Sequence, residues 1–91
     1  MNPSGQVAIV TGGGSGLGEA TARALAAKGA KIAVFDVGID NARKVAADIG
    51  GIAVKCDVSS AEGAEAAFAE VTEKLGSARI LINCAGIAVA L

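Results

Sequence analysis

A cluster of glycines near the N-terminus is the first feature of the sequence that could do chemistry. The run Thr11-Gly12-Gly13-Gly14-Ser15-Gly16-Leu17-Gly18 follows a short apolar stretch and precedes a stretch rich in alanine and leucine. Glycine lets a turn adopt positive φ and removes the Cβ that would block a pyrophosphate. A helix that begins after such a turn points its positive end and its backbone N–H groups at that anion. The cluster therefore predicts a phosphate-binding turn.

The spacing of the glycines limits which phosphate-binding motif this is. The general dinucleotide pattern G-x-G-x-x-G fails, because its third glycine, counted from Gly12, falls on Leu17. The pattern T-G-x-x-x-G-x-G fits, with Thr11, Gly12, Gly16 and Gly18. No G-K-[ST] closes the run, so a P-loop is excluded. Taken alone, the cluster could also be a tight turn with a purely structural role.

An aspartate at the end of the second predicted strand points to a dinucleotide. Asp36 closes the apolar stretch 31–36, where a carboxylate can accept both hydroxyls of an adenosine ribose. The same charge would oppose a 2′-phosphate by about 1–4 kcal/mol per charge pair. Neither Ser15 nor Val37, which would flank the ribose pocket, supplies a positive charge to offset it. NAD is therefore favoured over NADP, the alternative being a solvated aspartate at a strand end.

Two further candidate sites follow the third and fourth predicted strands. Asp57 and Val58 could hold an adenine through the carboxylate and the Val58 backbone, although a turn before a helix would look the same in sequence. Asn83-Cys84-Ala85-Gly86 turns out of the fourth strand, and its small residues let the backbone approach the riboses of a cofactor. Four such features, all facing one crevice, are harder to explain by chance than any one alone.

The elements that must position these residues alternate between strand and helix. Short apolar runs predict buried strands, and the segments between them are rich in helix formers. The predicted strands are Val7–Thr11, Lys31–Asp36, Ile52–Cys56 and Arg79–Asn83. The predicted helices are Glu19–Lys28, a helix capped by Asp40 that runs to Ile49, and a third that starts with the capping box of Ser59 and Glu62 and stops at Gly76. The apolar face of the third helix is predicted to comprise Ala64, Phe68, Val71 and Leu75.

The resulting order, β-α-β-α-β-α-β, predicts an α/β fold. Strands that are apolar on both faces and joined by helical crossovers form parallel sheets covered by helices. We expect a Rossmann-like, doubly wound parallel sheet with strand order 3-2-1-4 and the switch point between strands 1 and 4. In that order Cys56 and Cys84 lie at opposite edges, about 14 Å apart by strand spacing. That separation is too large for a disulfide.

Composition and charge restrict the function further. The 91 residues are 53% hydrophobic with two Phe and neither Trp nor Tyr, so one small domain with an aliphatic core is expected. A net charge of −1 without a basic stripe predicts no nucleic-acid or membrane partner. The absence of His and of a CxxC pair predicts no metal site. No signal peptide is evident in the N-terminal residues, and we expect a cytoplasmic protein.

Together these motifs resemble those of the short-chain dehydrogenase/reductase family, and the resemblance covers essentially the whole chain. The residues that carry it are Thr11-Gly12-x-x-x-Gly16-x-Gly18, Asp36, Asp57-Val58 and Asn83-Cys84-Ala85-Gly86. The family's usual motif after the fourth strand is Asn-Asn-Ala-Gly, and Cys84 replaces its second Asn. With the small and apolar residues that follow, this segment looks like the type 2 3-hydroxyacyl-CoA dehydrogenase branch.

The resemblance implies a role for each candidate residue. Ser15 and Leu17 would contact the pyrophosphate and ribose region, Asp36 the adenosine ribose, and Asp57 and Val58 the adenine. Cys84 to Gly86 would line the wall near the nicotinamide-side ribose. The full set of predicted cofactor-binding residues is Gly12, Ser15, Gly16, Leu17, Gly18, Asp36, Asp57, Val58, Asn83, Cys84, Ala85 and Gly86. The implied cofactor is NAD, the implied partner is a small-molecule substrate, and a homo-oligomer is expected.

The catalytic residues that the resemblance implies are not in this sequence. The family uses a Tyr-x-x-x-Lys pair with a Ser and a further Asn, the Tyr being the general acid/base. The chain contains no Tyr. We therefore expect residues 1–91 to be the N-terminal, NAD-binding portion of a single Rossmann domain, inactive without its catalytic half. Its apolar end, 86–91, and an uncovered edge of the fourth strand predict self-association or poor order at the C-terminus.

Three functions remain open from the sequence. The first is the NAD-binding part of an oxidoreductase acting on a secondary alcohol or ketone, such as a 3-hydroxyacyl-CoA. The second is a dinucleotide-binding module without catalytic activity. The third is an S-adenosylmethionine-dependent methyltransferase, whose first strand also ends in glycines and whose second ends in an acid. The Thr11-Gly12 spacing and the segment 83–86 argue against the third.

Overall fold

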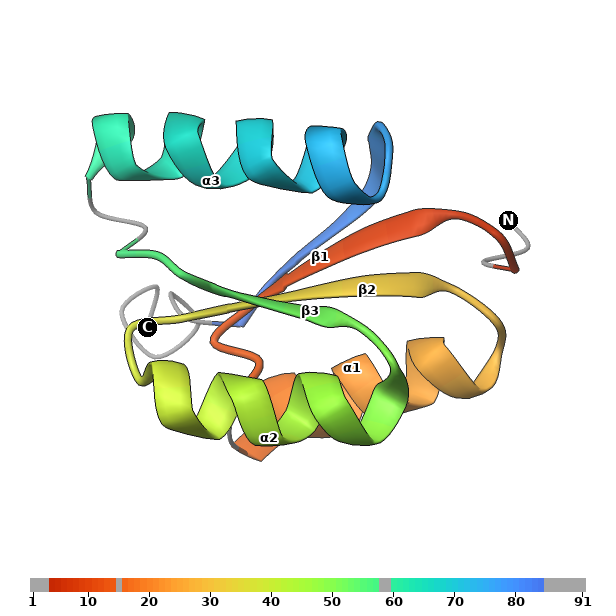
Figure 1. Cartoon of the computed structure of the whole chain (residues 1–91). Helices are drawn as coiled ribbons and strands as arrows, with labels where there is room; N and C mark the ends of the chain where they lie inside the picture. Colours follow the sequence, from red (N-terminus) through yellow and green to blue (C-terminus); the bar gives the residue numbers. More distant parts are fainter. Residues whose placement is uncertain (1–3, 15, 58–59, 85–91) are drawn as a thin grey trace.

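The apolar runs of the sequence form a parallel sheet with helices on both faces (Figure 1). The computed structural model describes residues 4–14, 16–57 and 60–84. Its strands are β1 (Val7–Thr11), β2 (Lys31–Asp36), β3 (Ile52–Lys55) and β4 (Ala78–Asn83), in the order β3-β2-β1-β4. They alternate with α1 (Gly16–Ala27), α2 (Ile39–Ile49) and α3 (Ala61–Lys74). The predicted α/β class and the predicted strand order are confirmed.

Side-chain alternation along the central strands builds two cores. Ile9 and Phe35 point to one face, where they pack with Ala67 and Val71 of α3. Val10 and the other alternate residues point to the opposite face, against α1 and α2. Figure 1 shows this division, with α3 alone on one side of the sheet and the two other helices on the other. Both faces of β1 and β2 are buried, which is why their sequences are continuously apolar.

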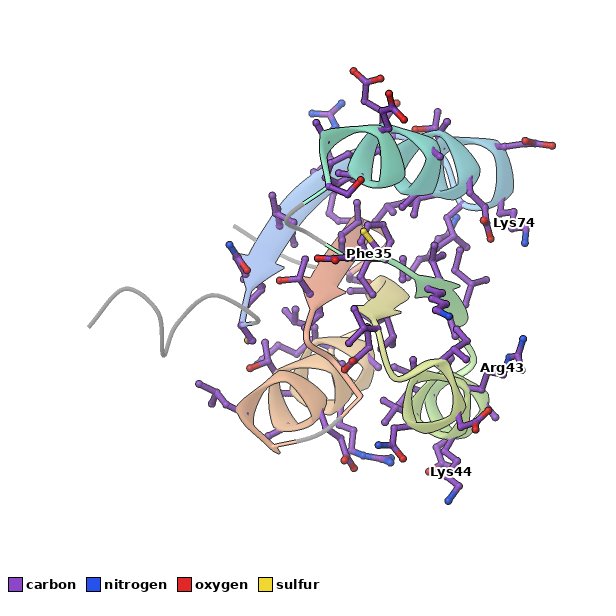
Figure 2. All side chains as sticks on the ribbon, turned by 90° about the vertical axis from the view of Figure 1, so that its left-hand side faces the viewer. Phe35, Arg43, Lys44 and Lys74 are labelled. Atoms are coloured by element: carbon purple, nitrogen blue, oxygen red, sulfur yellow. The ribbon has the colours of Figure 1, made fainter. Side chains whose placement is uncertain are left out.

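The largest buried side chain, Phe35, anchors α3 to the sheet. It is 1% exposed and lies on the side of the sheet that faces α3, as Figure 2 shows. Its ring contacts that of Phe68, with the ring centroids 5.7 Å apart. The predicted face of α3 is therefore only partly right, because Ala67 and Val71 are buried whereas Phe68 is 39% exposed. The small Ala67 lets the helix approach the sheet, and the Phe68 ring reaches Phe35 from the side.

β4 departs from the expectation that every strand is covered on both faces. It pairs with β1 on one side, and Leu81 is 56% exposed. Ile80 and Ile82 are half-buried on the side of α1 and α2. β4 is an edge strand within the described residues, so only its inner neighbour and one helix layer cover it. The residues predicted to be poorly ordered, 86–91, lie outside the described part of the chain.

The predicted helix starts and caps are less accurate than the predicted strands. α1 begins at Gly16 instead of Glu19, because two glycines form its first turn. The N-cap of α2 is Gly38, so Asp40 lies inside the first turn and does not cap it. The cap of α3 is Ser60, whose Oγ accepts from the Gly63 N–H at 3.2 Å. Ser59, the predicted cap, lies outside the described residues.

No helix in the described ranges has the length and apolar character needed to cross a membrane. Cys56, after β3, and Cys84, after β4, are both free thiols.

Candidate functional site

The ends of β1 and β4 are joined at the predicted switch point. The Thr11 hydroxyl donates to Asn83 Oδ1 at 2.7 Å, and the Cys84 N–H donates to the Thr11 carbonyl at 3.2 Å. Thr11 is 4% exposed, so this hydroxyl is satisfied inside the protein. The first residue of the glycine motif and the first residue of the strand-4 motif are therefore in direct contact.

Replacing Thr11 by valine is expected to lower the free energy of unfolding by about 1–1.5 kcal/mol, since valine keeps the shape and removes one partly buried hydrogen bond. Urea unfolding followed by circular dichroism measures this. Thr72→Val is the matched control, because the Thr72 hydroxyl donates to the Phe68 carbonyl on the exposed side of α3. Its expected cost is within about 0.5 kcal/mol. Equal losses in the two variants would contradict a linking role for Thr11.

The first half of the glycine turn is hydrogen-bonded to the end of β2. Gly12 has φ +67°, and its N–H donates to the Phe35 carbonyl at 2.7 Å. The Gly13 N–H donates to the same carbonyl at 3.3 Å. A Cβ at Gly13 would lie 2.8 Å from Val34 Cγ1, so β2 and the turn are in close contact. Glycine is required here because the backbone passes directly over a buried strand.

The Asp36 carboxylate holds the next residue of the turn. Its Oδ2 accepts from the Gly14 N–H at 2.9 Å, and its Oδ1 accepts from the Gly38 N–H at 3.0 Å. Asp36 is half-buried, so the carboxylate is also accessible from solvent. Each carboxylate oxygen has two acceptor positions. One position on each oxygen is used within the protein, and capacity remains for two hydroxyl donors.

The second half of the turn becomes the start of α1. Gly16 has φ +58°, the left-handed conformation that brings the chain into the helix. A Cβ on Gly18 would lie 2.0 Å from the Gly12 carbonyl oxygen, so the first turn of α1 rests directly on the beginning of the glycine turn. The first N–H groups of a helix have no partner within the helix. The Gly12, Gly13 and Gly14 amides are bonded to β2 residues, so among the described residues the start of α1 is where N–H donors for an anion would be available.

The end of β3 lies next to Asp36 on the other side. The Cys56 N–H donates to the Asp36 carbonyl at 3.2 Å, which places Asp57 one residue beyond that contact. Asp57 is exposed, and its carbonyl accepts from the Ser60 N–H at 3.0 Å. Burial raises the pKa of the Cys56 thiol, and the Asp57 charge raises it further. Cys56 therefore stays protonated at neutral pH and is a packing residue.

Most of the predicted site residues are thus neighbours at one edge of the sheet. Contacts run from Cys56 to Asp36, from Asp36 to the glycine turn, and from Thr11 to Asn83 and Cys84. Leu17, 64% exposed, lies at the start of α1. Four predicted residues lie outside the described part of the chain, and these are Ser15, Val58, Ala85 and Gly86.

Sequence reasoning missed Gly14 as a site residue. Its amide bonds Asp36, and a Cβ there would lie 2.8 Å from Asp36 Oδ2 and 3.1 Å from the Ala42 backbone nitrogen. The sequence did contain a signal for Gly14. The pattern T-G-x-x-x-G-x-G accepts any residue at positions 13–15, so the glycines at positions 13 and 14 need a reason of their own. Glycine is needed at these two positions because the turn packs closely against β2 and α2.

The rest of the described structure is less suited than this site to hold a ligand or a metal. A shallow groove lies between α1 and α2 at the helix ends far from the glycine turn, with Arg23 on its wall. Arg23 donates to Glu19 and to Asp48, each at 2.9 Å, and these bonds raise its pKa. The guanidinium thus ties the two helices together. Among the described residues no group of three His, Cys, Asp or Glu side chains could hold a metal.

A parallel sheet in this order, with a glycine turn leading from its first strand into a helix, defines a Rossmann-like fold. Residues 6–91 match the family model described as short chain dehydrogenase. The chain belongs to the short-chain dehydrogenase family.

Curated relatives and a solved structure agree with this assignment. A D-threitol dehydrogenase of Mycolicibacterium smegmatis is 43% identical over 92% of this chain and 34% of its own length. A 3-hydroxyacyl-CoA dehydrogenase type-2 of Rattus norvegicus is 40% identical over 96% of this chain and 34% of its own length. The chain therefore spans about one third of the length of these relatives. The predicted resemblance to the family and to the type 2 branch is confirmed.

The crystal structure of a 3-ketoacyl-(acyl-carrier-protein) reductase from Brucella melitensis, complexed with NADH, superposes with a TM-score of 0.83. It is 39% identical and covers 86% of this chain, which in turn covers 33% of that protein.

Proposed function

We propose that this chain binds NAD at the carboxyl ends of its strands and is the nucleotide-binding part of an NAD-dependent oxidoreductase. Its substrate would be a secondary alcohol or the corresponding ketone, and a 3-hydroxyacyl-CoA is the first candidate to test. The observation that carries the proposal is the Asp36 carboxylate lying 2.9 Å from the Gly14 amide, next to the start of α1. A ribose acceptor and a phosphate-binding helix end are thereby adjacent.

The absence of side chains in the glycine turn also supports this proposal. The backbone of the glycine turn approaches both β2 and α1 so closely that a Cβ at Gly13 or Gly18 would overlap with its neighbours. A turn without side chains leaves the N–H groups at the start of α1 open to a pyrophosphate. The NADH complex of the Brucella melitensis reductase supports a nicotinamide dinucleotide as the ligand class.

The chain's own residues would have separate tasks in this site. The first turn of α1 would stabilise the pyrophosphate charge, and Asp36 would accept hydrogen bonds from the adenosine ribose. Asp57 would lie beside the adenine, while Asn83 and Cys84 would line the wall next to the nicotinamide-side ribose. The bound nicotinamide would supply hydride transfer. In the family resemblance the proton moves through a tyrosine, and this sequence contains none.

Isothermal titration of the 91-residue chain with NAD tests the proposal. We expect a saturable heat with NAD, no heat with S-adenosylmethionine, and no turnover of 3-hydroxyacyl-CoA by this chain alone. A thermal shift with each ligand provides an independent readout, because a ligand that binds only the folded chain raises its Tm. Stabilisation by S-adenosylmethionine and not by NAD would overturn the proposal, as would the absence of any response to NAD.

A further inference from the structure

Both oxygens of the Asp36 carboxylate accept backbone hydrogen bonds from two different loops. Gly14 belongs to the glycine turn after β1, and Gly38 belongs to the turn between β2 and α2. The bonds measure 2.9 Å and 3.0 Å. A single side chain therefore links two loops that both border the proposed nucleotide site. Hydrogen bonds to an ionised acceptor are about twice as strong as those between neutral groups.

Among the described residues of the turn, the Gly14 amide is the one that bonds a side chain of β2. The amides of Gly12 and Gly13 donate to the Phe35 carbonyl, which no substitution removes. The position of Gly14 is further limited by the start of α2, since a Cβ there would lie 3.2 Å from Asn41 Cβ. Gly14 is thus held between the Asp36 carboxylate and α2, two residues before α1 begins.

We infer that Asp36 is a positioning residue in addition to its proposed contact with ribose. Its carboxylate fixes Gly14, and through Gly14 it fixes the place where α1 begins and where the pyrophosphate would be received. The expected effect on dinucleotide binding rests on the proposed function, whereas the contact between Asp36 and Gly14 does not depend on it. A preformed site binds more tightly because less conformational entropy is lost on binding. Removing the carboxylate therefore weakens contacts with parts of the ligand that Asp36 never touches.

Hydrogen exchange of the free 91-residue chain, followed by NMR, tests the positioning role without any ligand. In Asp36→Ala the Gly14 amide should exchange about tenfold faster or more, the factor expected for one hydrogen bond to a charged acceptor. The Gly12 amide is the internal reference and should not change, because its acceptor is a backbone carbonyl. Asp40→Ala removes an exposed carboxylate in the first turn of α2 and is the matched control, with no change at Gly14.

A conservative variant keeps the test decisive if Asp36→Ala fails to fold. Asp36→Asn has one acceptor oxygen and one N–H₂ group, so it can accept from Gly14 or from Gly38 but not from both. One of these two amides should lose protection while the other keeps it. Unchanged exchange of both amides in Asp36→Asn, or of Gly14 in Asp36→Ala, would overturn the inference.

The consequence for binding is measured with NAD and with an NAD analogue whose adenosine ribose lacks its 2′- and 3′-hydroxyls. If Asp36 only accepts from those hydroxyls, wild type and Asp36→Ala bind the analogue equally. If it also positions the turn, Asp36→Ala binds the analogue about three- to tenfold more weakly than wild type does. Equal affinities would overturn this part. If wild type binds neither dinucleotide, the proposed function fails, and the exchange experiment still decides the positioning role.

Discussion

Replacing Gly18 by alanine is expected to lower the free energy of unfolding by about 3 kcal/mol or more, and to abolish NAD binding. The added Cβ would lie 2.0 Å from the Gly12 carbonyl oxygen and 2.6 Å from its carbon. Both are backbone atoms, so no side-chain rotation relieves the overlap, and α1 must move away from the glycine turn. Domains of this size have little stability in reserve. Urea unfolding by circular dichroism and titration with NAD measure the two effects.

Gly50→Ala is the matched control for this prediction. Gly50 has φ +69° at the C-terminal end of α2, and a Cβ there would have nothing within 4 Å. Its cost is limited to the backbone conformation, about 1–2 kcal/mol, and NAD affinity should be unchanged. Comparing the free energies of unfolding of Gly18→Ala and Gly50→Ala distinguishes the cost of a steric overlap from the cost of an unfavourable backbone conformation. If Gly18→Ala were no less stable than Gly50→Ala, the close approach of α1 to the turn would be wrong.

The sheet could be predicted from the sequence because its determinants are local. Continuous apolar runs such as 7–10 and 32–35 can be buried on both faces only in the middle of a covered parallel sheet. Glycines end the helices between them, and Gly50 takes the left-handed conformation that such a stop requires. Right-handed crossovers then leave few strand orders, and the predicted one is found.

Helix starts were harder to predict because tertiary contacts override local propensity. Gly16 and Gly18 are poor helix formers, yet they form the first turn of α1. Gly16 supplies the left-handed φ of +58°, and at Gly18 only a residue without a Cβ fits beside Gly12. At α2, the aspartate that could have capped the helix is not used. Asp36, two residues before the N-cap, bonds the amide of Gly38 instead. Neither contact can be read from spacing along one element.

The residue types at each strand end predicted where the candidate site lies. They did not predict the hydrogen bonds between the residues of that site. Thr11 was recognised as a motif residue, and the sequence does not show that its hydroxyl reaches Asn83 across the sheet. The contact between Asp36 and Gly14 spans 22 residues and depends on the register of β1 with β2. Partial burial of β4 likewise depends on which elements lie beside it, a property of the assembled sheet.

Asp36→Ala is also expected to change the choice between NAD and NADP more than any other single substitution. The carboxylate would favour a ribose with free hydroxyls and repel a 2′-phosphate, so wild type should prefer NAD by about ten- to a thousandfold. Without it, NAD affinity should fall about tenfold or more while NADP affinity falls less or rises. The measurement is a pair of calorimetric titrations of each protein. Unchanged curves for both dinucleotides would remove Asp36 from the site.

Strand register supplies a control for the charge argument. Lys55 is the partner of Asp36 across β2 and β3, so the two side chains leave the sheet on the same face. Lys55 is exposed, and the register places this cation beside Asp36 in the sheet. In Asp36→Ala its charge is no longer opposed, and it should attract the 2′-phosphate. Adding Lys55→Ala should then lower NADP affinity and leave NAD affinity unchanged.

Salt dependence tests whether Asp36 and Lys55 act on the 2′-phosphate through their charges. Because both charges act at an accessible site, the difference in NADP affinity between wild type and Asp36→Ala should shrink as salt is raised from low to physiological ionic strength. A change in discrimination that is independent of salt would instead indicate that Asp36 acts through the shape of the glycine turn.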